Sequence, residues 1–132
     1  MKKMILVTGV GGFIGAAVAK SLLEKGKVVV GVDDLSLSLR SNVPEGVLFE
    51  EFDLSNTELV NSLKRFGDFE AIYHIAGQSG GEPSYDDPIR DLDSNTASTL
   101  NLLSLAVKSK DCVFLYASTV SVYGENGKKF LN

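Results

Sequence analysis

Three glycines near the start of the chain stand where a backbone could hold a phosphate group. Gly9, Gly12 and Gly15 have the spacing G-x-x-G-x-x-G, between an apolar run at residues 4–7 and a helix-like run at residues 16–20. Glycine lets a backbone turn tightly and approach a ligand closely, and the N-terminus of a following helix offers free N–H groups to an anion. A flexible turn between a strand and a helix is the simpler interpretation, because the regular dinucleotide fingerprint is G-x-G-x-x-G.

Acidic residues at the end of the next apolar run favour the phosphate interpretation. Residues 27–32 are mostly β-branched, which is typical of a buried parallel strand, and Asp33 and Asp34 follow. Asp33 lies about 18 residues after Gly15, close to the spacing of about 20 at which dinucleotide-binding folds place the carboxylate that bonds the adenine ribose. The alternative for such an aspartate is a helix cap or a turn. Together, the glycines, helix, strand and acid predict a βαβ unit that binds a dinucleotide.

The elements that must position these residues alternate along the chain. Strands are expected at residues 4–7, 27–32, 47–52, 71–75 and 112–117. Helices are expected directly after Gly15, between Ser55 and Gly67, where Ser55 and Glu58 form a capping-box pattern, and over residues 88–108. Strands that alternate with helices predict an α/β fold, a Rossmann-like doubly wound parallel sheet truncated after about five strands.

Polar clusters follow the carboxyl ends of the predicted strands. They are the glycine loop, Asp33 with Asp34, Asp53, His74 with the turn at residues 76–81, and Ser118 with Thr119. In a doubly wound sheet, ligands bind outside this edge, where the strand order reverses. The sequence therefore predicts a ligand site along this edge.

The composition limits the classes to which the protein can belong. The 132 residues have the length of one domain, and 44% of them are hydrophobic, enough for a globular core. A net charge of −4 argues against nucleic acid or an anionic membrane as a partner, and no apolar run approaches the ~18 residues that span a bilayer. The single cysteine, Cys112, excludes an internal disulfide and makes the cytoplasm the expected location. With one histidine and one cysteine, no metal site is expected.

Six motifs, in order along the chain, carry a resemblance to a known family. They are TGVGGFIG at residues 8–15, the pair Asp33–Asp34, FDL at 52–54, HIAGQS at 74–79, NTASTLNLL at 95–103 and YASTVSVYG at 116–124. Together they resemble the N-terminal half of the extended short-chain dehydrogenases/reductases, in the group of NAD-dependent sugar-nucleotide epimerases and dehydratases. The resemblance implies that residues 1–132 are an incomplete NAD-binding Rossmann domain. It also implies a parent enzyme that acts on a nucleotide sugar by moving a hydride to and from nicotinamide.

The resemblance assigns cofactor contacts to the matching positions. Gly9, Gly12, Phe13, Ile14 and Gly15 would hold the pyrophosphate. Asp33 would bond the ribose hydroxyls, Asp34 and Leu35 would lie beside the adenosine, and Asp53 and Leu54 would flank the adenine. Ile75, Ala76, Gly77, Gln78 and Ser79 would line the central stretch of the cofactor, and Asn95 matches the helix asparagine of N-x-x-G-T-x-N, in which Ser98 replaces the glycine. NAD is expected rather than NADP, because Asp33 would repel a 2′-phosphate, although Arg40 lies in the nearby loop.

The resemblance also assigns catalytic positions. Thr119 stands where the family places a catalytic Ser or Thr that hydrogen-bonds the reacting oxygen of the substrate. A shift of one residue in the alignment would give that role to Ser118. His74 matches a strand histidine of the family and is expected to be structural rather than a proton carrier.

The chain departs from the family pattern at the catalytic base. The family uses the tyrosine of Y-x-x-x-K, where lysine lowers the tyrosine pKa. None of the four tyrosines here has a lysine four residues later; Tyr123 is followed by Lys128, at the wrong spacing. The chain is therefore expected to be an inactive piece of a longer enzyme that lacks the C-terminal substrate domain. The open edge of its fifth strand predicts a homodimer or aggregation.

Two alternatives remain at this point. A non-catalytic, dinucleotide-sensing Rossmann module is favoured by the missing Y-x-x-x-K and disfavoured by Thr119 in the catalytic position. A Rossmann-like domain without any nucleotide function is the third possibility.

Overall fold

A computed structural model describes residues 4–124 of the chain and places five parallel strands in one sheet. The strands are β1 (Met4–Thr8), β2 (Val28–Asp33), β3 (Leu48–Glu51), β4 (Phe69–His74) and β5 (Val113–Tyr116). Their order is β3-β2-β1-β4-β5, so the chain works outward from β1 in one direction and then in the other. The predicted Rossmann-like doubly wound sheet is confirmed, and the strand order reverses between β1 and β4.

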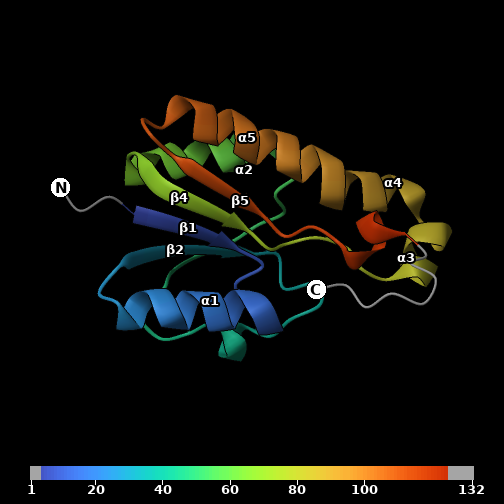
Figure 1. Ribbon diagram of the computed structural model, residues 1–132, viewed down its shortest axis with the longest axis horizontal. Helices are drawn as coiled ribbons and strands as arrows, with labels where there is room; N and C mark the ends of the chain where they lie inside the picture. Colours follow the sequence, from blue (N-terminus) through green and yellow to red (C-terminus); the bar gives the residue numbers. More distant parts are fainter. Residues whose placement is uncertain (1–3, 125–132) are drawn as a thin grey trace.

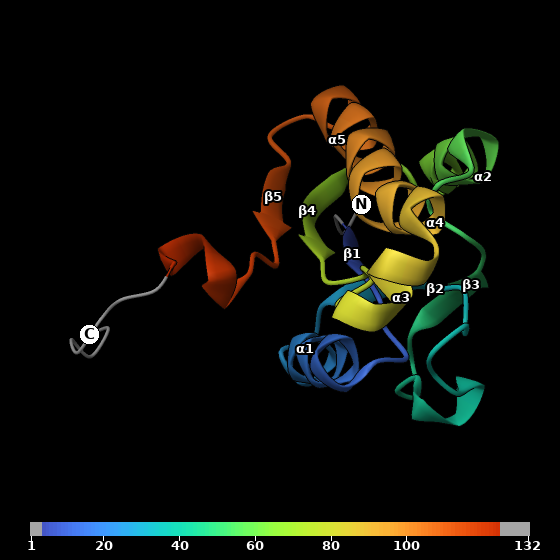
Figure 2. The same ribbon diagram turned by 90° about the vertical axis from the view of Figure 1, so that its right-hand side faces the viewer.

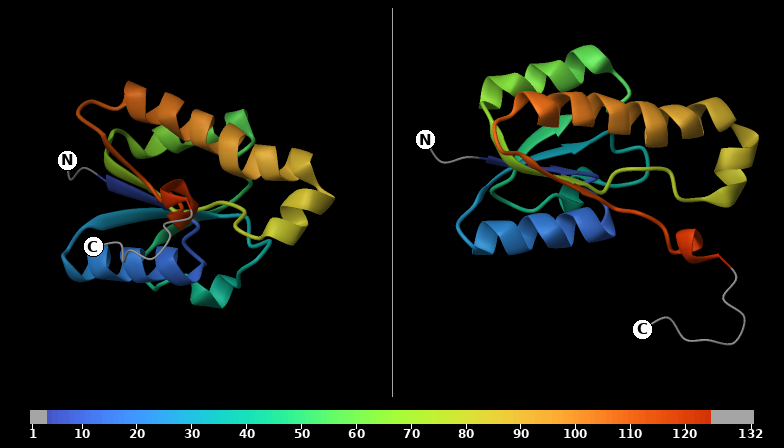
Figure 3. Two further views of the ribbon diagram at one scale, coloured as in Figure 1. Left: turned by 45° about the vertical axis from the view of Figure 1, so that its right-hand side comes forward. Right: turned by 45° about the horizontal axis from the view of Figure 1, so that its top comes forward.

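Helices cover both faces of the sheet. The first, α1 (Phe13–Glu24), lies on one face, and α2 (Thr57–Ser62) and α5 (Ser98–Lys108) lie on the other (Figure 1). Two short helices, α3 (Gly81–Asp86) and α4 (Pro88–Leu92), extend beyond the carboxyl end of the sheet (Figure 3). The remaining helical segments are η1 (Arg40–Asn42), η2 (Leu63–Phe66), the π-helical η3 (Asp93–Ala97) and η4 (Val120–Tyr123).

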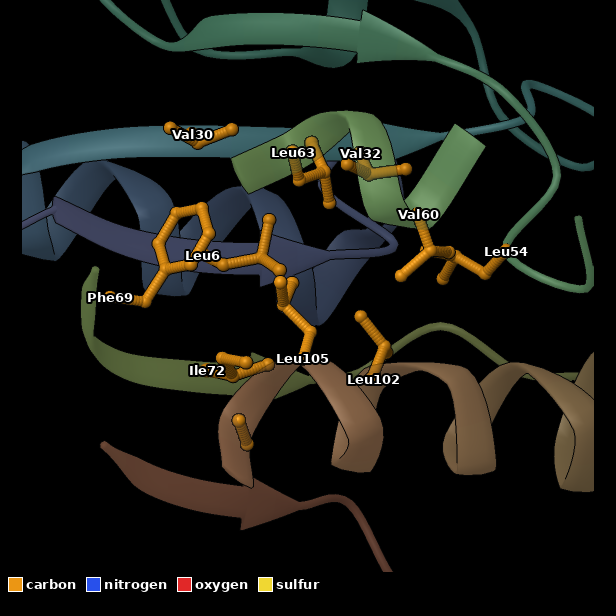
Figure 4. Close-up of a cluster of buried hydrophobic side chains, with 11 residues drawn as sticks. Leu6, Val30, Val32, Leu54, Val60, Leu63, Phe69, Ile72, Leu102 and Leu105 are labelled. Carbon is orange, nitrogen blue, oxygen red and sulfur yellow. The ribbon is translucent and has the colours of Figure 1, made fainter. Parts of the chain in front are cut away.

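The hydrophobic core forms two layers, one on each face of the sheet. Leu6 and Ile72 from the strands pack with Leu102 and Leu105 of α5 in the larger cluster (Figure 4). On the opposite face, the second cluster gathers side chains of β1, β2 and α1, among them Val7. Because both faces of the central strands are buried, their sequences are almost continuously apolar.

The first helix begins earlier than its sequence suggests and ends as expected. It begins at Phe13, so Gly15 lies inside its first turn rather than before it. At its other end, Gly26 has φ +71° and donates its N–H to Leu23, while Lys27 donates to Leu22. This pair of hydrogen bonds is a Schellman motif, and the left-handed conformation explains the glycine.

The second helix has a different cap from the predicted one. Asn56, rather than Ser55, is the N-cap, and its Oδ1 accepts the N–H groups of Glu58 and Leu59 at 3.0 and 3.1 Å. Ser55 instead donates its N–H to Asp53 Oδ1 at 2.8 Å. This turn at Asp53 delays the helix, so the predicted capping box does not form.

The single helix predicted over residues 88–108 is interrupted by η3. Within this π-helical segment, Ser98 donates its N–H to Asp93, five residues earlier. The hydroxyls of Ser98 and Thr99 then donate to the carbonyls of Ser94 and Asn95 at 2.5 and 2.6 Å. These side-chain bonds satisfy carbonyls that a regular helix would bond through its backbone, so the widened turn is locally stable.

The edges of the sheet are β3 and β5. Within residues 4–124, β5 has β4 as its only strand neighbour, and its residues Val113 and Tyr116 are more than half exposed. None of the helices in this range is long and apolar enough to cross a membrane.

Candidate functional site

An open cleft of about 830 Å³ lies at the carboxyl end of the sheet. It is bounded by the glycine loop, by the segments that follow β2, β3 and β4, and by α3 and α4. Most of the predicted cofactor residues line it: Gly9, Gly12, Phe13, Ile14, Gly15, Asp33, Asp34, Asp53, Leu54, Ile75, Ala76, Gly77 and Gln78. Leu35, Ser79 and Asn95 lie next to these residues in the structure or the chain but do not line the cleft, and neither do Ser118 and Thr119.

The glycine loop is packed so tightly that larger residues would not fit. Gly9 has φ +67°, and a Cβ on it would lie 2.9 Å from the backbone of Ala76. A Cβ on Gly15 would lie 2.0 Å from the carbonyl oxygen of Gly9. The N-terminus of α1 carries no side-chain cap and no acidic residue in its first turn. Its free N–H groups therefore face the cleft as a potential anion site, which fits a diphosphate.

The carboxylate of Asp33 joins the glycine loop to the segment after β2. Its Oδ2 accepts the N–H of Gly11 at 2.9 Å. Its Oδ1 accepts the N–H of Leu35 and the hydroxyl of Ser38, both at 2.9 Å. A carboxylate has about four lone-pair positions, so about one remains for a ligand while Ser38 keeps its bond. Ser38 was not predicted from the sequence, because its only signal was its place in the polar loop after Asp33.

Arg40, the cation in this loop, does not line the cleft. Its guanidinium stacks over the ring of Phe49, with its central carbon 4.2 Å from the ring centroid. Asp33 at the end of β2, rather than Arg40, is therefore the charged residue that contacts the glycine loop.

The segment after β3 is held by α5. Asp53 Oδ1 accepts the N–H of Ser55, and Asn101 of α5 donates to the carbonyls of Leu54 and Ser55 at 2.9 and 3.0 Å. Asn101 was not predicted from the sequence, although an asparagine between Leu100 and Leu102 was a usable signal.

The segment after β4, residues 75–80, is called the β4 turn here. Thr8 Oγ1 accepts the N–H groups of Ile75 and Ala76, each at 3.1 Å. The side-chain amide of Asn95 accepts the N–H of Gln78 and donates to the carbonyl of Gln78. Thr8, which is fully buried, was also missed, because a threonine at a strand end carries no distinctive signal.

His74 is a neutral, buried link between β1 and α5. Its Nδ1 and Nε2 lie 2.9 Å from the hydroxyls of Thr8 and Thr99. Thr8 already accepts two N–H groups, so it donates its hydrogen to Nδ1; Thr99 donates to a carbonyl, so it accepts from Nε2–H. Burial lowers the pKa of His74 from 6.5 to about 4. These contacts match the expected structural role.

The predicted catalytic residues lie apart from the cleft. Ser118 and Thr119 follow β5 and are exposed. The hydroxyl of Thr119 caps η4 by accepting the N–H of Ser121 at 3.2 Å. Figure 2 shows this segment leaving the end of β5 on the side away from α3. The structure therefore brings most of the predicted cofactor residues together along the cleft but does not place the two predicted catalytic residues there.

Comparison with known proteins agrees with this geometry. The model of the NAD dependent epimerase/dehydratase family matches residues 5–131, and the chain belongs to this family. Its five-stranded parallel sheet with flanking helices is the Rossmann-like fold of the epimerase structures that it resembles.

Two curated relatives and two solved structures are similar to this chain. UDP-glucuronic acid decarboxylase 1 of Danio rerio is 36% identical over 94% of this chain and 29% of its own length, and a UDP-glucose 4-epimerase of Azospirillum brasilense is 33% identical over 91% and 34%. The crystal structure of the Thermotoga maritima UDP-glucose 4-epimerase with UDP-glucose has a TM-score of 0.87 and 36% identity, over 96% of this chain and 41% of that one. Bordetella bronchiseptica WbmF, in complex with NAD⁺, has a TM-score of 0.78 and 29% identity, over 95% and 40%. The chain spans about a third of the length of these two curated relatives.

Proposed function

We propose that this chain is the NAD-binding part of an enzyme that epimerises, dehydrates or otherwise modifies a nucleotide sugar. The observation that carries the proposal is the pairing of the uncapped N-terminus of α1 with the Asp33 carboxylate across the glycine loop. The free N–H groups would bind the diphosphate, and Asp33 would accept hydrogen bonds from the adenine ribose. Family membership and the NAD⁺ and UDP-glucose complexes of similar proteins support it.

The residues of this chain would bind and orient the cofactor. When bound, nicotinamide supplies a hydride acceptor and donor. The segment after β3, with Asp53 and Leu54, would receive the adenine, and the β4 turn would line the central stretch of the cofactor. Thr119 or Ser118 would hydrogen-bond the reacting oxygen of the sugar. Since none of its four tyrosines has a lysine four residues later, we propose that this chain alone does not catalyse the reaction.

A dinucleotide-sensing module without catalysis is the second candidate. The missing Y-x-x-x-K pattern and the position of Thr119 outside the cleft favour it. The two candidates differ in the sequence that follows Asn132 in the reading frame. A Y-x-x-x-K pattern followed by a substrate domain supports the enzyme, and its absence supports the sensor.

Replacing Asp33 with alanine should weaken NAD binding about tenfold or more, because an accepting carboxylate would be lost from the ribose site. The same change should narrow the preference for NAD over NADP, since it removes the negative charge that repels a 2′-phosphate. Calorimetric titration of both variants with NAD, NADP and ADP-ribose measures the two effects. Unchanged NAD affinity in Asp33→Ala would show that the carboxylate has no such role.

We also propose that the chain works in the cytoplasm and forms a homodimer through the exposed edge of β5. Unpaired backbone groups on an edge strand can extend the sheet into a second copy. Light scattering over a range of concentrations should show a mass above that of one 14.2 kDa chain. A monomer at high concentration would contradict the dimer without affecting the NAD site.

A further inference from the structure

The β4 turn is built around one amide side chain. Asn95 Oδ1 accepts the N–H of Gln78 at 2.8 Å, and Asn95 Nδ2 donates to the carbonyl of Gln78 at 3.0 Å. The side chain therefore pairs with this residue as a neighbouring strand would. Gly77 leaves the necessary space, because a Cβ there would lie 2.8 Å from Asn95 Oδ1. The conformation of the turn thus depends on which way the amide faces.

Asp91 sets the direction of that amide. It lies one helical turn before Asn95, and its Oδ1 accepts from Asn95 Nδ2 at 3.0 Å. An ionised carboxylate only accepts hydrogen bonds, so the NH₂ group of Asn95 must face it. The reversed amide would place its oxygen against the carboxylate and its NH₂ against the N–H of Gln78. Only the orientation that Asp91 selects matches both backbone groups of Gln78.

The hydroxyl of Ser84 lies between the same carboxylate oxygen and the carbonyl of Gly80 at the other end of the turn. The hydroxyl of Ser84 lies 2.7 Å from Asp91 Oδ1 and 2.8 Å from the carbonyl oxygen of Gly80. Hydrogen bonds to a charged group are about twice as strong as neutral ones. Asp91 is half-buried and lines the cleft, as Gln78 does. Because a hydroxyl has one hydrogen and both of these oxygens only accept, Ser84 bonds one of them at a time, so Asp91 supports the turn through Asn95 and Gln78.

We propose that Asp91 is a positioning residue that holds the β4 turn in the conformation required by the part of NAD beyond its ADP moiety. The proposal rests on the proposed function, in which the β4 turn lines the central stretch of the cofactor. The adenine end of the cleft depends on other residues, chiefly Asp33 and Asn101. Loss of Asp91 should therefore weaken contacts with the part of the dinucleotide beyond ADP and leave contacts with the adenosine end unchanged.

Amide hydrogen exchange tests, without any ligand, whether Asp91 holds the β4 turn. In Asp91→Ala, the Gln78 amide should exchange about tenfold faster or more, while Ile75 and Ala76, held by Thr8, should be unchanged. Asp91→Asn keeps an accepting oxygen and should stay within about threefold of the original rate. Asp93→Ala removes an exposed charge two residues away, outside the cleft, and serves as the matched control. Unchanged Gln78 exchange, or loss of the whole fold in Asp91→Ala, would overturn the proposal.

Calorimetry with ADP-ribose and ADP tests whether the turn that Asp91 holds contacts the part of the cofactor beyond ADP. Asp91→Ala should lower ADP-ribose affinity about tenfold and ADP affinity less than twofold, with Asp91→Asn close to the unaltered protein. Equal losses for both ligands, or none for ADP-ribose, would contradict the positioning role. If the unaltered protein binds neither ligand, the proposed function fails, and the functional half of this proposal fails with it. The exchange rates still decide whether Asp91 holds the turn.

Discussion

Replacing Gly15 with alanine should abolish NAD binding and destabilise the fold by roughly 3 kcal/mol or more. The added Cβ would lie 2.0 Å from the Gly9 carbonyl oxygen, 2.7 Å from the Gly9 carbonyl carbon and 3.1 Å from the Val10 Cα. All three atoms belong to the backbone, so no side chain can rotate to make room. Helix α1 would have to move away from the glycine loop, and its N-terminus would lose its place at the cleft.

Denaturant unfolding and NAD titration of the Gly15→Ala variant measure both losses. Gly81→Ala is the matched control, because a Cβ there meets nothing within 4 Å, and it should change stability by less than about 1 kcal/mol. If Gly15→Ala unfolds and binds NAD as the unaltered protein does, α1 cannot pack on the loop as described.

The second large effect concerns His74 and pH. Its pKa is about 4 in the folded chain and 6.5 as the ordinary value, so between these values the unfolded chain binds the proton and the folded chain does not. Stability should therefore be fully present above pH 6.5 and fall as the pH drops toward 4. The loss from this residue is roughly 3 kcal/mol, because each pKa unit corresponds to about 1.4 kcal/mol.

A His74→Gln variant isolates this contribution. Titrating carboxylates give both proteins the same background, and His74 is the only histidine in the chain. The free energy of unfolding, measured from pH 7 to pH 4, should decline less steeply in the variant by roughly 3 kcal/mol in total. An NMR titration of the unaltered protein should place the imidazole midpoint near 4. Parallel stability curves, or a midpoint near 6.5, would show that the ring is not buried as a neutral group.

The parts of the fold that the sequence predicted are those with dense local signals. The five strands carry apolar runs, and Gly9 and Gly15 stand where no other residue fits the backbone. Helix α3 escaped prediction because its six residues, GEPSYD, bury none of their side chains and have no helical apolar spacing. The π-helical η3 was not predicted, because its stability depends on hydroxyls that donate to carbonyls four residues earlier in the chain. The presence of serines and threonines in a sequence does not show whether their hydroxyls make such bonds.

The candidate site followed the same division. Cleft-lining residues such as Gly12 and Ala76 belong to motifs that sequence spacing can identify. Residues that position other residues of the cleft, such as Asn101 and Asp91, could not be identified in this way, because their roles depend on which elements the fold brings together. Thr119 follows the edge strand β5 and does not line the cleft, so the catalytic role that its motif indicates stays a prediction.

Helix α5, together with the η3 segment that continues into it, makes contact with both ends of the cleft. Asn95 holds Gln78, and Asn101, less than two helical turns later, holds Leu54 and Ser55. Any sliding or rotation of this helix must therefore displace both walls at once. A ligand fragment that immobilises one wall lowers the entropic cost of ordering the other, so the two halves of a dinucleotide should bind with positive cooperativity.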